Sequence, residues 1–298
     1  MKRHFKKIVC VDHTGIDEFV EADLKSCCEE LVIYQDFPQD EEEIVFRMQG
    51  ADAVFVSWNT RITADILVRC KDLNYVGMCC SLYDEKSANV DIAKARELGI
   101  EVRGVRDYGD DGVVEFIISE LVQLALGTNG IYLNEEPEEL KSLHLGIIGM
   151  GAVGRKLADA AAYFGMQVSY YSRNQKEDLS YLYLSLPQLL EECDVISLHL
   201  PRNTVLLGKE EFQQMGNQKV IVSSGLGYAY DKEAFDSWIA NEKNFAIMDA
   251  GTIDEAFRIK YENHPHVLFN SRVSGFTKNA RARLADKVID QVKAYLQA

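Results

Sequence analysis

The chain has 298 residues, 47% of them hydrophobic, and a formal net charge of -15. This length allows two domains of ordinary size, and the apolar content is sufficient for hydrophobic cores. The acidic charge would repel the phosphates that dominate nucleic-acid affinity. We therefore expect neither a nucleic-acid partner nor an anionic membrane surface.

The basic N-terminus, MKRHFKKIVCVDHTG, contains a short apolar run that ends at Asp12 and His13. This run is too short for a signal peptide or a membrane span, so we expect a cytoplasmic protein. The seven cysteines include no Cys-x-x-Cys spacing. We expect reduced thiols and no metal site.

The first part of the chain alternates between two kinds of pattern. Short apolar runs at 5–12, 29–36 and 51–59 predict buried parallel strands, and further strands are expected at 73–81 and 96–104. Helix-like stretches such as DEEEIVFRMQG and TADILVRCKD separate the runs. This alternation predicts an α/β fold with a doubly wound parallel sheet.

The middle of the chain predicts a long, mostly buried helix at 112–126, GVVEFIISELVQLAL, which we expect to bridge two domains. An acidic linker, 134–142, follows. From Leu143 the alternation resumes, with strands expected at LHLGIIG, QVSYYS, DVISLHLP, KVIVSSG, NFAIMDA and HVLFNSRV. The C-terminal stretch, TKNARARLADKVIDQVKAYLQA, predicts one amphipathic helix that returns to the first domain.

A glycine-rich turn with G-x-G-x-x-G spacing directly follows the strand LHLGIIG and opens a helix. In that context the first glycine permits the tight turn, the second lets the backbone approach a pyrophosphate, and the third brings the helix against the strand. The unpaired amides of the helix start would face the phosphates. We predict a dinucleotide site in this turn, formed by Gly149, Met150, Gly151, Ala152, Val153 and Gly154.

The strand QVSYYS ends at Ser172 and Arg173, where NAD-binding sites of this kind carry an acidic residue that binds the ribose. A hydroxyl and a guanidinium can hold a 2'-phosphate, which a carboxylate would repel. We therefore favour NADP over NAD. The alternative is that Arg173 is a solvated surface arginine.

Four motifs, GIIGMGAVG, DVISLHLP, SSGLGYAYDKEAF and AIMDAG, follow one another after an α/β domain. In this order the chain resembles the D-isomer-specific 2-hydroxyacid dehydrogenases. The resemblance implies a flavodoxin-like substrate domain (1–112 and 275–298) and an inserted Rossmann domain (113–274). It also implies that the ends of later strands line the cofactor, at His199, Leu200, Pro201, Ser224, Gly225 and Asp249.

Members of that family reduce 2-keto acids or oxidise D-2-hydroxy acids with a nicotinamide. An arginine holds the substrate carboxylate, a histidine is the general acid/base, and a glutamate orients the histidine. In this chain the three positions correspond to Leu226, Arg272 and Asp254 respectively. Leu226 cannot bind an anion, and Arg272 cannot act as a base because the pKa of arginine lies above about 12. Losing general acid/base catalysis costs about 10²- to 10⁴-fold in rate.

One interpretation of these changes is a relocated mechanism, in which Arg272 supplies the cation and pairs with Asp254. The proton would then come from His199, Tyr228 or Tyr230, although each of these can equally be a structural residue. The loop MCCSLYDEKSANVD is longer than the corresponding glycine-rich turn of the family. It is expected to place three side chains near the substrate, namely Cys79, Cys80 and Ser81.

Two functions remain open from the sequence. The first is an NAD(P)-dependent oxidoreductase acting on a small anionic 2-keto or 2-hydroxy acid. The second is a catalytically inactive protein that senses NADP(H) or binds a partner. The family also carries a long dimerisation arm where this chain has only GTNGIYLNEEPEELKS. We expect a homodimer with a shortened arm.

Overall fold

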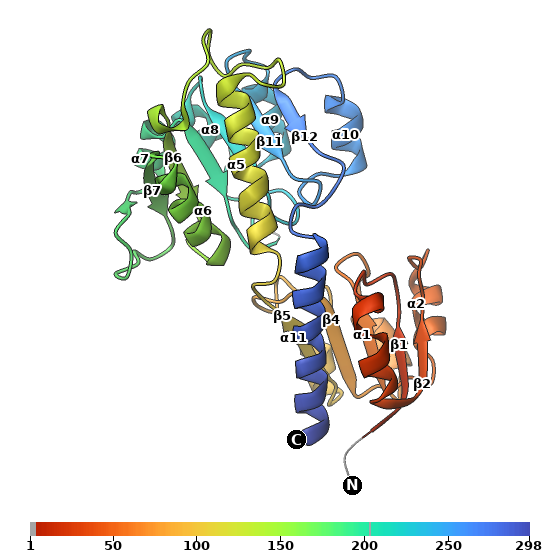
Figure 1. Cartoon of the computed structure of the whole chain (residues 1–298). Coiled ribbons are helices and arrows are strands. Elements are labelled where there is room, and N and C mark those ends of the chain that lie inside the picture. The colour runs from red at the N-terminus through yellow and green to blue at the C-terminus, as the bar shows by residue number, and fades with distance from the viewer. Residues whose placement is uncertain (1–3, 203) are drawn as a thin grey trace. The chain divides into compact units, whose positions relative to one another are not determined.

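The computed structural model describes residues 4–202 and 204–298. The chain forms two compact units: the first combines Met1–Tyr108 with Thr277–Ala298, and the second is Gly109–Phe276. Each unit has one parallel sheet with helices on both faces (Figure 1). The expected α/β class with two doubly wound sheets is confirmed.

The sheet of the first unit has the strand order β2-β1-β3-β4-β5, and all of its pairings are parallel. This is the flavodoxin-like order. The strands are β1 (Phe5–Cys10), β2 (Cys28–Ile33), β3 (Ala53–Val56), β4 (Tyr75–Ser81) and β5 (Glu101–Val105).

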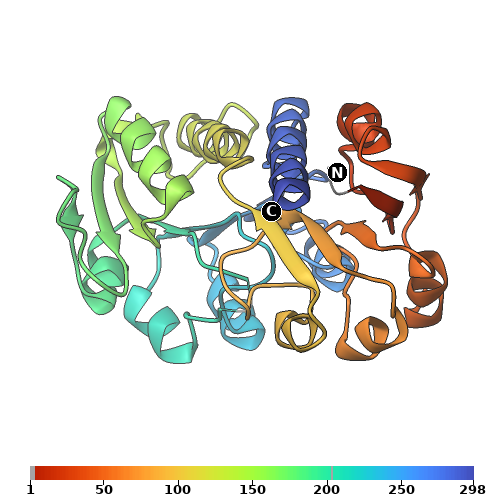
Figure 2. The ribbon, with the colours of Figure 1, turned by 90° about the horizontal axis from the view of Figure 1, so that it is seen from below.

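Two groups of helices cover this first sheet. One face packs against α1 (Asp17–Lys25) and α11 (Lys278–Gln297), which lie side by side in Figure 2 (red and blue). The other face packs against α2 (Glu41–Met48), α3 (Ala64–Arg69) and α4 (Ile92–Glu97). Several of these helices begin where a side chain accepts a backbone N–H of the first turn, as at Asp40, Thr63, Asp91 and Thr277.

The second unit has the order β12-β11-β10-β9-β6-β7-β8, again with parallel pairing throughout. Numbered from β6, this is the Rossmann order with one strand added at the far edge. Its strands are β6 (His144–Ile148), β7 (Gln167–Tyr171), β8 (Leu182–Tyr183), β9 (Val195–Leu198), β10 (Val220–Ser223), β11 (Phe245–Met248) and β12 (Val267–Phe269).

Helices also cover both faces of the second sheet. One face carries α5 (Asp110–Leu126) and α6 (Ala152–Tyr163), which are neighbours in Figure 2. The short 3-10 helix η1 (Leu140–Ser142) precedes β6. The other face carries α7 (Leu186–Glu192), α8 (Lys209–Met215), α9 (Lys232–Ile239) and α10 (Glu255–Tyr261).

No described helix combines the length and the apolar character that crossing a membrane requires. Within 4–202 and 204–298, no three His, Cys, Asp or Glu side chains lie close enough together to hold a metal ion. All seven cysteines are buried free thiols.

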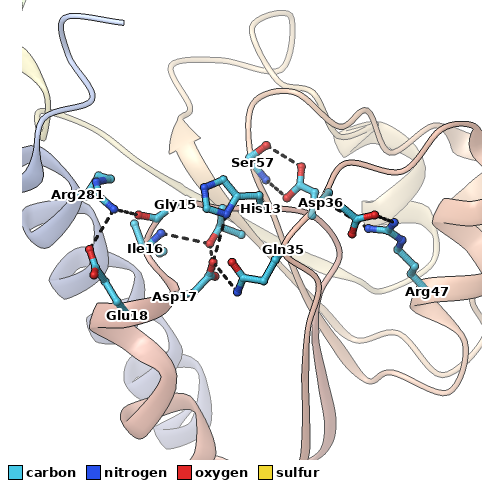
Figure 3. A network of polar contacts seen from close by, with 12 residues as sticks. His13, Gly15, Ile16, Asp17, Glu18, Gln35, Asp36, Arg47, Ser57 and Arg281 are labelled. Carbon is cyan, nitrogen blue, oxygen red and sulfur yellow. Dashed lines mark hydrogen bonds and ion pairs between the residues drawn. The ribbon is translucent and has the colours of Figure 1, made fainter. Parts of the chain in front are cut away.

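A polar network lies where β1 and β3 of the first unit end (Figure 3). The fully buried carboxylate of Asp12 accepts the Ser57 N–H at 2.9 Å, the Ser57 hydroxyl at 2.6 Å and the Thr60 hydroxyl. Nearby, the buried Arg47 donates to the Val11 carbonyl at 2.9 Å and to the Asp36 carboxylate at 3.0 Å. The Asp12 bonds join the ends of two adjacent strands inside this unit.

Replacing Asp12 by alanine should therefore destabilise the protein strongly. The change leaves the Ser57 and Thr60 donors unsatisfied in the interior, at about 1–3 kcal/mol for each buried group. We expect the free energy of unfolding to fall by about 3 kcal/mol in urea denaturation. The matched control is Asp23→Ala, which removes an exposed ion pair to Lys293 and should change the stability much less, because exposed ion pairs are screened by solvent. Equal losses in the two variants would contradict this account.

Candidate functional site

The glycine turn after β6 has the geometry that a dinucleotide site requires. Gly149 has φ +100°, and a Cβ there would lie 2.1 Å from the carbonyl oxygen of His199. A Cβ on Gly154 would lie 2.3 Å from the Gly149 oxygen, whereas one on Gly151 would meet nothing within 4 Å. The first and third glycines therefore permit close packing, and the second leaves its backbone open.

The first turn of α6 begins directly at this glycine turn. Gly151 is the N-cap of α6 and provides no side-chain hydrogen bond to it. Met150 is buried, while Ala152 and Val153 are half-buried. A pyrophosphate could be held here by backbone N–H groups and the positive end of the helix dipole. The turn thus fits the cofactor predicted from its spacing.

The end of β9 lies against this turn. The His199 N–H donates to the Ile148 carbonyl at 2.8 Å, and its Nε2 lies 2.9 Å from the Ser197 hydroxyl. The imidazole is surrounded by protein, which lowers the pKa of His199 to about 4. Near neutral pH the ring is therefore uncharged, so it is a poor source of a catalytic proton. Leu200 and Pro201, which follow it, are half-buried.

The end of β7 carries the two residues expected to read the adenosine ribose. The Ser172 hydroxyl donates to the Asn174 carbonyl at 2.6 Å. Arg173 is exposed, and among the described residues no hydrogen bond or ion pair involves its guanidinium. Arg155 of α6 is paired with Asp178 at 2.7 Å in the loop after β7. Of these two arginines, Arg173 is the one that has no hydrogen bond or ion pair to the described residues.

Three loops meet where β10, β11 and β12 end. Asp249 is buried and accepts the Gly251 N–H and the Ser274 N–H, both at 2.7 Å. The Thr252 hydroxyl donates to the Ser223 and Gly225 carbonyls at 3.1 and 3.0 Å. These bonds connect the loop after β11 to the two neighbouring loops.

The position that corresponds to the family's arginine has an apolar environment. Leu226 is half-buried, and its side chain lies 3.1 Å from where a Cβ on Gly251 would be. The neighbouring Gly227 N–H donates to the Gly251 carbonyl at 3.1 Å. Ser224 and Gly225 are half-buried, and Gly225 faces the Leu200 carbonyl. Leu226 thus forms part of an uncharged wall.

Asp254 has partners that the sequence did not indicate. It is the N-cap of α10, accepting the Phe257 N–H at 2.9 Å, and it pairs with Lys232 at 2.7 Å. The Lys232 hydrogen bond lowers the pKa of Asp254. The Asp254 N–H in turn donates to the Tyr228 hydroxyl at 3.1 Å. The suggested ion pair between Asp254 and Arg272 is therefore wrong, because the Asp254 carboxylate pairs with Lys232 instead.

Arg272 itself is exposed on the segment after β12. Among the described residues, no hydrogen bond or ion pair involves its side chain. An unpaired guanidinium is a good ligand for a carboxylate, because it can donate two parallel hydrogen bonds. Its backbone is held near the loop after β11 by the Ser274 contact to Asp249.

The structure corrects two other expectations. Tyr230 is almost fully buried, and its hydroxyl donates only to the Met248 sulfur at 3.6 Å, so it cannot deliver a proton to a ligand. Cys79 and Cys80 are 0% and 2% exposed. Because β4 continues to Ser81, these two successive thiols point into the cores on opposite faces of the first sheet. Neither thiol lines a substrate loop, whereas Ser81 is half-buried.

Lys232 is a residue that the sequence interpretation missed. It occupies the first turn of α9, where a cation is disfavoured by the helix dipole. A lysine at that position was a signal that a specific anionic partner lies nearby. The Asp254 hydrogen bond raises the pKa of Lys232.

Comparison with known proteins agrees with this architecture. A family model described as "D-isomer specific 2-hydroxyacid dehydrogenase, NAD binding domain" matches residues 128–256. A glyoxylate reductase from Aeropyrum pernix is 27% identical over 87% of this chain and 84% of its own length.

Two solved structures share the fold, each with a TM-score of 0.81. One is D-lactate dehydrogenase from Aquifex aeolicus, complexed with NAD and lactic acid, which is 20% identical with 98% of this chain and 96% of that chain covered. The other is an acyclic imino acid reductase in complex with NADPH and D-Arg, which is 21% identical with 97% of each chain covered. With the Rossmann strand order and the glycine turn, these matches show that residues 128–256 resemble the NAD-binding domain of the D-isomer-specific 2-hydroxyacid dehydrogenases and that the chain shares the fold of the two solved structures.

Proposed function

We propose that this protein is a nicotinamide-dependent oxidoreductase that interconverts a small 2-keto acid and the corresponding 2-hydroxy acid. The observation that carries the proposal is the open backbone at Gly151, at the N-terminus of α6 and on a sheet of Rossmann order. A bound nicotinamide would supply or accept the hydride. Curated relatives named glyoxylate reductase and hydroxypyruvate reductase support a small 2-keto acid as the substrate class.

Arg272 is the proposed carboxylate ligand. It is exposed and has no partner among the described residues, whereas Leu226 is apolar and packs toward Gly251. A charge-assisted hydrogen bond is worth about 1.5–3 kcal/mol, so one guanidinium is sufficient to hold a small anion. The carboxylate would thus be bound from the β12 side rather than from the turn after β10.

The second candidate is an NADP(H)-binding protein without catalytic activity. One observation favours it: the only carboxylate at the family's triad positions, that of Asp254, is engaged by Lys232 and by the start of α10. No histidine is available at 272 to be oriented by it. In this case the protein would bind NADP(H) at the glycine turn without catalysing a reaction.

We propose NADP as the preferred cofactor. Arg173 is exposed beside the end of β7 and makes no hydrogen bond or ion pair within 4–202 and 204–298, and Ser172 adds a hydroxyl in place of a carboxylate. A guanidinium can bind a 2'-phosphate bidentately. The Arg155–Asp178 pair keeps the other nearby arginine occupied.

We also propose a homodimer formed through α5. Its residues Val114, Ile118, Val122 and Leu126 recur at spacing i, i+4 and are all partly exposed, with Leu126 42% exposed. Ridges of this spacing pack against each other in helix pairs. In a chain of net charge -15, a second copy can approach only at a face with few charges. The α5 ridge has that character.

Turnover tests the main proposal. Wild-type protein should oxidise NADPH in the presence of glyoxylate or hydroxypyruvate, and Arg272→Leu should raise the KM for the keto acid by about 10- to 100-fold, because 1.4 kcal/mol corresponds to a factor of ten. The control is Lys243→Leu, which removes an exposed cation from the same unit. An unchanged KM would refute the role of Arg272. No NADPH oxidation with any keto acid would favour the inactive alternative.

Calorimetry tests the cofactor preference. NADPH should bind more tightly than NADH, and Arg173→Ala should weaken NADPH binding by about tenfold while NADH binding stays the same. NADH acts as the internal control, since it lacks the 2'-phosphate. Equal affinities of the wild-type protein for the two cofactors would remove the claim.

Light scattering after size exclusion tests the dimer. We expect the wild-type protein to elute with twice the mass of its chain, and Ile118→Glu to be monomeric because it places a buried charge at the contact. Ile259→Glu is the control, since Ile259 is 70% exposed on α10, away from the ridge. A monomeric wild-type protein at micromolar concentration would exclude this interface.

A further inference from the structure

Three side chains, those of Tyr228, Lys232 and Asp254, come together where the loop after β10, the start of α9 and the loop after β11 meet, and only Asp254 of these stands at a triad position of the family. The Tyr228 hydroxyl accepts the Asp254 N–H at 3.1 Å. Lys232 Nζ lies 3.9 Å from the centre of the Tyr228 ring and 2.7 Å from Asp254 Oδ2. The phenol therefore contacts both the Lys232 ammonium and the backbone of Asp254, and the ammonium is paired with the Asp254 carboxylate.

Packing holds the ring of Tyr228 in place. Its centroid is 5.6 Å from that of Tyr230 and 6.1 Å from that of Phe257, both of which belong to the core under α9 and α10. The residue is half-buried, so its hydroxyl is fixed in position without being sealed inside the core. A catalytic group must be held in this way, because small misplacements cost large factors in rate.

The charges around the phenol suit a proton donor. Burial raises the pKa of Tyr228, so the hydroxyl is protonated at neutral pH. The Lys232 cation and the Asp254 N–H would stabilise the phenolate left behind, and they oppose burial and the Asp254 carboxylate, which raise the pKa. The other candidates lack these features: His199 is uncharged at neutral pH, Tyr230 is buried, and Arg272 does not release a proton.

We propose that Tyr228 is the proton donor of this protein, with Lys232 and Asp254 as its positioning residues, an inference that rests on the proposed keto-acid reduction. The Tyr228 O–H bond breaks and its proton moves to the carbonyl oxygen of the 2-keto acid, while the carbonyl carbon gains the hydride that reduced nicotinamide supplies. The keto acid is reduced to the hydroxy acid. The Tyr228 phenolate then recovers a proton from solvent, and in the oxidation direction the same phenolate accepts the hydroxyl proton.

Kinetics with matched tyrosine variants tests this role. Tyr228→Phe should lower kcat for glyoxylate reduction by about 100-fold or more, with the dissociation constant for NADPH within twofold of the wild-type value. Tyr132→Phe, which removes an exposed phenol elsewhere in the same unit, should keep the wild-type kcat. Retention of more than half of kcat by Tyr228→Phe would overturn the inference and leave the proposed function standing.

A second readout does not depend on turnover. The protein is labelled with 13C at tyrosine Cζ, and the Tyr228 signal is identified from its loss in Tyr228→Phe. When oxamate, a pyruvate-like anion that is not reduced, is added to NADPH-loaded protein, the Tyr228 signal should shift and the Tyr132 signal should not. In Lys232→Met the Tyr228 signal should titrate at higher pH than in the wild-type protein, since the phenolate loses its cation.

The outcomes separate the two proposals. Oxamate that binds by calorimetry without moving the Tyr228 signal would overturn the role of Tyr228 alone. Oxamate that does not bind, together with wild-type protein that reduces no keto acid, would overturn the proposed function and this inference with it.

Discussion

The candidate site depends on one buried carboxylate. Asp249 ends β11 at 1% exposure and accepts N–H groups from Gly251 and Ser274, each at 2.7 Å. A buried carboxylate without such partners would cost several kcal/mol, so these contacts strongly favour a single loop arrangement. As a result, the segment that carries Arg272 and the loop that leads to Asp254 are tied to the same point of the sheet. The grouping of functional side chains follows from that constraint.

A sequence predicts a strand or turn well when every residue in it has the same environment. The central strands of both sheets are covered on two faces, so their residues are apolar in unbroken runs, as in Val220–Ser223 and Phe245–Met248. The glycine turn was equally specific, since close contacts exclude a side chain at Gly149 and Gly154. The edge strand β8, only Leu182–Tyr183, was not predicted because two residues carry no periodicity.

The sequence could not predict the directions in which individual side chains point. Counting five residues from Asp249 finds the triad position Asp254, but the backbone there begins a helix and directs the carboxylate to the Phe257 N–H and to Lys232. Lys232 lies in the first turn of α9, and only the fold brings the two together. The same limit explains the error at the thiols Cys79 and Cys80, since alternation along a strand buries both when each face is covered.

The distribution of charge also explains why a leucine is tolerated at 226. Lys232 is paired with Asp254, whereas no hydrogen bond or ion pair joins the Arg272 side chain to the described residues. Leu226 adds apolar surface next to Gly251 and provides no donor that water could solvate. Attraction between a cation and an anion grows as the surroundings become less polar. Among the described residues, the apolar side chain of Leu226 thus leaves the guanidinium of Arg272 as a charged group of these loops without an ion pair, although the chain as a whole is strongly acidic.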